Sequence, residues 1–285
     1  LTGRQFVESS DFQAAIPHLQ RGLDRLQRVS VQQDTRALRF ELHRLLGVSY
    51  RSIQGWLSQT AVECYEAALE VGRELESERE ITSLLFGIWV TQLMRLDLGK
   101  ARQHAQAMLQ HAQRSADPSI SEEAHIAMAN TLFWLGDSEE TLACLNRSGL
   151  IPVSGEQRLG KQGLQGFDLS ALAVTFEGLA AFQLGFFTRA KAAQRHLAQR
   201  GENADELPFS RAIALQGATW LACLFMDVVV LEPLAVLLEQ LSRSHGFVFY
   251  QGIGEFFRGY CLLQHGQFAA AEQAMIAGYQ DYMVR

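Results

Sequence analysis

Histidine and cysteine are the residue types in this sequence that could bind a metal ion or act as a nucleophile. His104 and His111 lie seven positions apart, so a helix would present both on one face. A zinc ion needs a further ligand nearby, and the sequence places none there, so we expect no metal site. No CxxC pair occurs, and we interpret each cysteine as a small core residue of a protein in a reducing cytoplasm: Cys64, Cys144, Cys223 and Cys261.

A glycine-rich segment at 160–166, with the sequence GKQGLQG, is the stretch most similar to a phosphate-binding loop. Such a loop ends in Lys-Ser or Lys-Thr and follows a strand, and this segment has neither feature. The sequence also contains no HExxH or GxSxG motif, and no GxGxxG after a strand. We therefore expect no catalytic residues and no cofactor, and we predict that this 285-residue chain is not an enzyme.

The same glycines belong to a longer predicted loop, residues 149–166, which also contains Pro152, Arg158 and Lys161. Loops of this length without secondary structure are often functional. Arg158 and Lys161 are therefore candidates for a lid or clamp over a ligand. The alternative is an insertion that the fold tolerates.

Composition indicates a helical protein. The chain has 285 residues, of which 48% are apolar, and only 5 prolines, the residue that breaks helices. Its net charge of −6, without a basic cluster, argues against binding to nucleic acid or to an anionic membrane. The longest apolar stretch, about 220–238, contains Asp227, Glu232 and Pro233, which favours two core helices over a membrane span.

A local pattern recurs about every forty residues. A helix ends at an anchor residue, with a small residue seven positions before it and another five positions after it. Close helix packing requires small residues at the crossing, and glycine ends helices by adopting the left-handed conformation. The anchors are Ser10, Leu96, Gly136, Gly185 and Gly266, with Met226 taken as the anchor of a further pair.

The spacing of the anchors predicts where the remaining repeats lie. Leu96 and Gly136 are 40 residues apart, whereas Gly136 and Gly185 are 49 apart, which accommodates the inserted loop. Further helix pairs are expected at about 34–76 and 208–245. At Leu96 the small residue seven positions earlier is replaced by Trp89, which we expect to lie in the core.

These positions resemble the tetratricopeptide (TPR) motif in its long-helix form. The resemblance implies an all-α, right-handed solenoid of antiparallel helix pairs over residues 1–285. The chain is also similar to the C-terminal repeats of bacterial signalling proteins in which a nucleotide cyclase or kinase precedes an NTPase module. The segments that carry this second resemblance are 50–55, 85–89, 123–125, 131–136 and 257–260.

The ends of the sequence suggest a longer protein. No initiator Met is present, and the last residues, 282–285, continue a predicted helix without a cap. Solenoids need polar terminal repeats, so we expect this chain to be a fragment of a multidomain protein.

The TPR resemblance also implies which residues face a partner. The first helix of each pair lines the concave surface, and the positions there are mostly apolar and aromatic, which favours a protein or peptide partner, a segment of the same polypeptide or an uncharged small molecule. Such a surface also permits a homodimer. The candidate groove residues are Phe86, Val90, Met94, Ile126, Asn130, Phe133, Trp134, Phe182, Gln183, Trp220, Phe256 and Tyr260.

Two functions follow as hypotheses. The first is a non-catalytic regulatory or scaffold domain that binds a protein or peptide and controls an attached cyclase, kinase or NTPase. The second is the small-molecule sensor domain of a TPR-containing bacterial regulator, with its ligand under the loop at 149–166.

Overall fold

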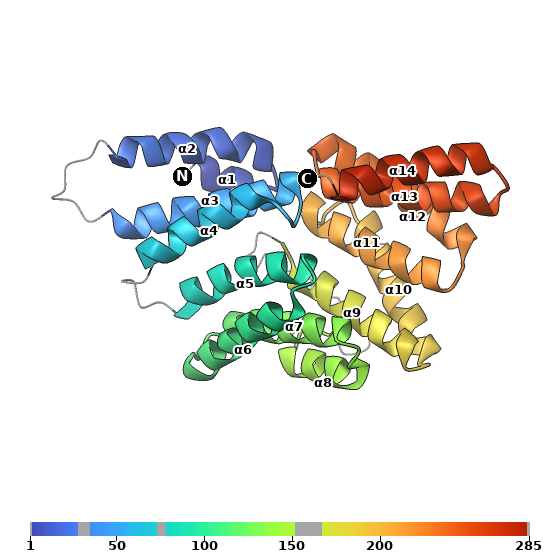
Figure 1. The fold of residues 1–285 in the computed structure, drawn as a ribbon, viewed down its shortest axis with the longest axis horizontal. Helices are drawn as coiled ribbons and strands as arrows, with labels where there is room; N and C mark the ends of the chain where they lie inside the picture. The colour runs from blue at the N-terminus through green and yellow to red at the C-terminus, as the bar shows by residue number, and fades with distance from the viewer. Residues whose placement is uncertain (1, 28–34, 73–77, 152–166, 284–285) are drawn as a thin grey trace. The chain divides into compact units, whose positions relative to one another are not determined.

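A computed structural model describes residues 2–27, 35–72, 78–151 and 167–283. These residues form fourteen α-helices and no strand, which confirms the predicted all-α fold (Figure 1). The helices are α1 (Thr2–Glu8), α2 (Phe12–Gln27), α3 (Arg36–Gln54), α4 (Gln59–Gly72), α5 (Glu78–Met94), α6 (Leu98–Arg114), α7 (Pro118–Trp134), α8 (Ser138–Ser148), α9 (Leu169–Gln183), α10 (Phe187–Glu202), α11 (Pro208–Leu224), α12 (Val228–His245), α13 (Val248–Gln264) and α14 (Phe268–Met283).

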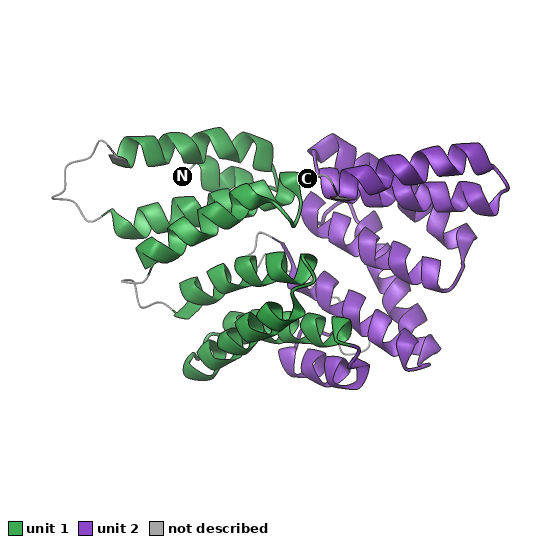
Figure 2. Cartoon of the chain, viewed as in Figure 1, with its two compact units in different colours: residues 1–135, 162–166 green, residues 136–161, 167–285 purple. Residues whose placement is uncertain are grey.

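The helices fall into two compact units, one with α1–α7 and one with α8–α14 (Figure 2). Within each unit every helix packs against the next one in sequence, and odd-numbered helices also contact the next odd-numbered helix, as α5 does with α7 and α9 with α11. This sequential packing is that of an α-helical repeat solenoid. The expected pairs at 34–76 and 208–245 correspond to α3 with α4 and α11 with α12.

The glycine anchors have the left-handed backbone conformation that the pattern predicts, and the anchors that are not glycine share it. All six lie in the left-handed region: Ser10 (φ 62°), Leu96 (φ 60°), Gly136 (φ 86°), Gly185 (φ 81°), Met226 (φ 53°) and Gly266 (φ 75°). At Leu96, its own N–H donates to the Leu93 carbonyl and the Asp97 N–H donates to the Gln92 carbonyl. This is the hydrogen-bond pair of a Schellman motif, and it ends the helix by satisfying carbonyls that have no helical partner.

The residue after the anchor is the N-cap of the next helix, the residue directly before its first turn. In four of the turns it is an aspartate whose carboxylate accepts a hydrogen bond from the backbone N–H three residues later. An oxygen in this position satisfies one of the free N–H groups of the first helical turn. The four are Asp11, Asp97, Asp137 and Asp227.

Small residues let the paired helices approach closely. A Cβ on Gly178 of α9 would lie 2.9 Å from Ala193 Cβ of α10, and one on Gly259 of α13 would lie 2.6 Å from Met275 Cγ of α14. Trp89, which replaces the small residue in its pair, is fully buried as expected. Its Nε1 donates a hydrogen bond of 2.9 Å to Thr131 Oγ1 in α7, so its polar atom is satisfied within the core.

Candidate functional site

In the unit with α1–α7, the candidate groove residues lie mainly in the interior. Phe86, Val90, Ile126, Asn130 and Phe133 are all buried, with at most 9% of each residue exposed. Their rings and methyl groups therefore contribute to packing and offer a partner little surface.

Met94 and Trp134 keep more accessible surface in this unit. Met94 is half-buried, and Trp134 is 46% exposed. The Trp134 Nε1 donates to Asn130 Oδ1 at 3.1 Å, one turn earlier on α7. This hydrogen bond holds the indole along the helix.

In the unit with α8–α14, the candidate residues remain accessible. Phe182, Trp220, Phe256 and Tyr260 are half-buried and Gln183 is exposed. Trp220 and Phe256 come together although they lie on different helices, α11 and α13. They line one pocket, and Phe182, Gln183 and Tyr260 are not part of its wall.

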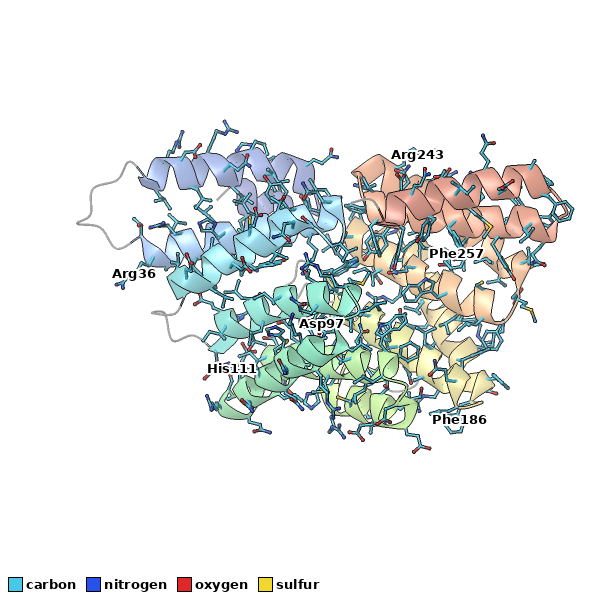
Figure 3. The ribbon with its side chains drawn as sticks, in the orientation of Figure 1. Arg36, Asp97, His111, Phe186, Arg243 and Phe257 are labelled. Atoms are coloured by element: carbon cyan, nitrogen blue, oxygen red, sulfur yellow. The ribbon has the colours of Figure 1, made fainter. Side chains whose placement is uncertain are left out.

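This aromatic pocket is a cavity of about 200 Å³. Three helices contribute to its wall: α11 through Trp220, α13 through Ile253 and the Phe256–Phe257 pair, and α14 through Tyr279 and Tyr282. Two glycines, Gly252 and Gly278, complete the lining. Figure 3 labels Phe257 among the side chains of this unit.

The two glycines explain why the pocket exists. A Cβ on Gly278 would lie 2.5 Å from the Gly252 carbonyl oxygen and 2.6 Å from the Phe256 backbone nitrogen. The backbones of α13 and α14 therefore touch directly, and only glycine fits at this point of both helices. With no side chain at the contact, the neighbouring rings enclose a space that they do not fill.

The pocket suits recognition by apolar contact. Tyr282 packs against Phe249, with ring centroids 4.9 Å apart, and burial raises the pKa of its hydroxyl, so it stays neutral at physiological pH. None of the described residues that line this pocket is Asp, Glu, Lys, Arg, His or Cys. Its wall therefore offers ring surface and tyrosine hydroxyls rather than charge or a nucleophile.

The residues singled out for metal or thiol chemistry do not converge. Among the described residues, no group of three or more His, Cys, Asp or Glu side chains could hold a metal ion. His111 instead contacts the Glu78 carboxylate of α5. Burial raises the pKa of the Cys64 and Cys261 thiols to about 11, which leaves both as thiols rather than reactive thiolates.

Two candidates, Arg158 and Lys161 of the predicted lid, lie outside the described residues, so the lid stays a prediction. Sequence reasoning also missed Tyr279 and Tyr282, because it took surface positions only from the first helix of each pair. The available signal was Gly278 followed by aromatic residues one and four positions later on the second helix.

An exposed aromatic edge is a second feature that the groove positions did not include. Phe187, the first residue of α10, and Phe225, which follows α11, have ring centroids 6.2 Å apart. Phe186 is 54% exposed at the first of these turns (Figure 3), and Met226 is 76% exposed at the second. Lys191 Nζ lies 4.3 Å from the Phe225 ring centroid and contacts Asp227, which gives this edge a polar border.

Comparison with known proteins found no matching family model and no similar curated protein. None of the helices in the described parts of the chain is long and apolar enough to cross a membrane.

Proposed function

We propose that this chain is a non-catalytic regulatory or scaffold domain that binds a protein or peptide partner. The observation that carries the proposal is the aromatic pocket of α11, α13 and α14, because it is open and apolar and the described residues that line it include no catalytic group. The TPR resemblance supports the same conclusion, since such repeats bind other chains. It also suggests that the partner signal reaches an attached cyclase, kinase or NTPase domain.

The size of the pocket favours a peptide over a small molecule. Sites for small molecules usually span about 300–1,000 Å³, and this pocket, at about 200 Å³, is smaller. A space of this size suits one large apolar side chain of a partner. Burial of one such side chain stabilises a complex by only about 1.5–3 kcal/mol, so the partner must also contact surface beside the pocket.

That additional surface lies on α14. Ile276 is 51% exposed and Tyr279 is 55% exposed, and their spacing of three places them side by side on the helix. Tyr279 belongs to the pocket wall as well. An amphipathic helix with apolar residues at positions i, i+3 or i+4, and i+7 would place one side chain in the pocket and others on this stripe.

Selection from a random peptide display library tests this proposal. We expect the selected peptides to share helical apolar spacing and to bind the Tyr279→Ala variant at least tenfold more weakly. Phe186→Ala is the matched control, because Phe186 is also an aromatic residue and is 54% exposed, against 55% for Tyr279. Peptides that bind both variants equally, or a selection that enriches none, would contradict the proposal.

The small-molecule sensor remains the alternative. Its predicted ligand position, under residues 149–166, falls mostly outside the described residues. A metabolite that raises the melting temperature of this chain, but not of a variant with 155–163 replaced by a short linker, would favour it over the peptide hypothesis.

A further inference from the structure

The unit with α1–α7 contains a second, larger cavity, which is separate in sequence and chemistry from the aromatic pocket. It lies among α1, α2 and α3 and has a volume of about 530 Å³, which is within the range of small-molecule sites. Five leucines contribute its apolar wall, and we call it the leucine cavity: Leu19, Leu26, Leu38, Leu42 and Leu45.

Glycines on two helices pack against leucines of the cavity wall. Gly3 of α1 and Gly22 of α2 both line the cavity. A Cβ on Gly3 would lie 2.8 Å from Leu19 Cδ2, and one on Gly22 would lie 3.1 Å from Leu42 Cδ1. At both positions a leucine side chain packs directly against the backbone of the neighbouring helix, and the same leucines, Leu19 and Leu42, present apolar surface to the cavity.

The charged groups around the cavity are mostly basic. Arg4, His18, Arg21 and Arg25 line it, and Glu41 is the one carboxylate among the described residues of its wall. Because Arg44 donates two hydrogen bonds of 2.8 Å to the Glu41 carboxylate, that negative charge is already neutralised.

Two of the arginines have donors left for a ligand. Arg21 uses its Nε in a hydrogen bond to the Pro17 carbonyl, and its Nη2 lies 3.3 Å from His18 Nδ1. Arg25 forms no ion pair with any described residue, whereas Arg4 is paired with Glu8. Arg21 and Arg25 are four positions apart and therefore neighbours on α2, which concentrates uncompensated positive charge at one side of the cavity.

We propose that the leucine cavity binds a small organic anion with an aliphatic body, such as a medium-chain carboxylate. The alkyl chain would lie against the leucines, and the carboxylate would accept hydrogen bonds from Arg21 and Arg25, the pairing that guanidinium groups favour. An aliphatic body fits better than a planar one, because the described residues of the wall include five leucines and no Phe, Tyr or Trp on which a flat ring would stack. This inference does not depend on the peptide site of the other unit.

Calorimetric titration with decanoate, below its micelle-forming concentration, tests the proposal. We expect one decanoate per chain and a loss of affinity of about tenfold for Arg25→Gln, the effect of removing one charge-assisted hydrogen bond. Arg114→Gln is the matched control, because Arg114 is an exposed arginine of the same unit that does not line the cavity. Decanol should bind more weakly than decanoate, and decyltrimethylammonium should not bind.

A second variant tests the position of the alkyl chain. Leu38→Trp adds bulk at a half-exposed wall residue (52% exposed), so it should block decanoate without unfolding the chain, which far-UV circular dichroism would check. The proposal is overturned if decanoate does not bind, if several molecules bind per chain, if decanol binds equally well, or if Arg25→Gln and Arg114→Gln behave alike.

Discussion

The two units solve the same packing problem in different ways. In the first, the Tyr65 ring of α4 lies between Gly47 of α3 and Gly87 of α5, and a Cβ on either glycine would come within 2.5 Å of ring carbons. In the second, α13 and α14 meet at Gly252 and Gly278, where each missing Cβ would strike backbone atoms. One contact is filled by a side chain, and the other is backbone against backbone.

This difference shows how one repeat framework produces both core and binding surface. A large ring between two glycines uses all the space that the glycines leave, and Tyr65 is only 1% exposed. Where two helix backbones touch directly, no side chain lies between them. The residues next to the contact then place their side chains to the side of it. In α13 and α14 those side chains include Phe256 and Tyr279, which enclose the aromatic pocket.

Removal of the Tyr65 ring should have the largest effect. Tyr65→Ala should destabilise the chain by about 3–5 kcal/mol, because it leaves a cavity between three helices. Tyr65→Phe is the sharp control, since the Tyr65 hydroxyl is buried without a hydrogen-bond partner among the described residues. Loss of that hydroxyl should be neutral or slightly stabilising. Urea unfolding followed by circular dichroism measures both, and a large loss from Tyr65→Phe would show that the hydroxyl has a structural role.

A substitution at the backbone contact between α13 and α14 should have the next largest effect on stability. Gly278→Ala should cost about 2–3 kcal/mol, because neither helix backbone can move aside as a flexible side chain would. Urea unfolding followed by circular dichroism measures this loss. Gly99→Ala is the control: a Cβ there meets only Asp97 Oδ1, at 3.8 Å. This change should stabilise α6 by about 0.5–1 kcal/mol. Equal losses from both variants would refute the close-contact argument.

Two capping aspartates, Asp227 and Asp117, the N-cap of α7, should make both units sensitive to acid. Hydrogen bonds from the Lys191 side chain lower the pKa of Asp227, and a hydrogen bond from the Ser119 hydroxyl lowers the pKa of Asp117. A carboxylate whose pKa is lower in the folded state stabilises the fold above its ordinary pKa, and this stabilisation disappears as the pH falls through the folded value.

We therefore expect Asp227→Asn and Asp117→Asn to flatten the dependence of stability on pH between about pH 5 and pH 2.5. Asparagine still caps a helix, so the change isolates the charge from the cap. Thermal melts across that range measure the effect. A variant that loses as much stability in acid as the unaltered chain does would show that its aspartate contributes none of the pH dependence.

The smallest expected effect is a gain in the stability of the fold. Leu96 and Met226 occupy the left-handed anchor position without being glycine, one in each unit, and both are more than 70% exposed. The left-handed conformation costs an L-residue about 1–2 kcal/mol, and the added freedom of glycine in the unfolded chain offsets about half of that. Leu96→Gly and Met226→Gly should each stabilise the chain by about 0.5–1 kcal/mol in the same melts, and destabilisation by either would show that its side chain makes a contact that matters.

Much of the fold was predictable from sequence because its signals are local. The anchor pattern predicted where helices end and that glycine anchors are left-handed. The structure adds that Ser10, Leu96 and Met226 adopt the same conformation, since a helix that ends with a Schellman turn needs it whatever the side chain. The small residues before and after the anchor predicted where helices approach each other. Low proline content and the absence of strand patterns predicted the helical class.

Only the tertiary structure decided which predicted surface residues stay accessible. Phe133 and Trp134 are adjacent candidates on α7, yet the first is 9% exposed and the second 46%. Trp220 and Tyr282 lie more than sixty residues apart in the sequence and line one pocket. Exposure and proximity of this kind depend on how neighbouring helices cross, and a crossing is determined by side chains and glycines on both helices together. The periodicity of one helix therefore shows that it has a buried face, whereas the pocket exists only where three helices meet.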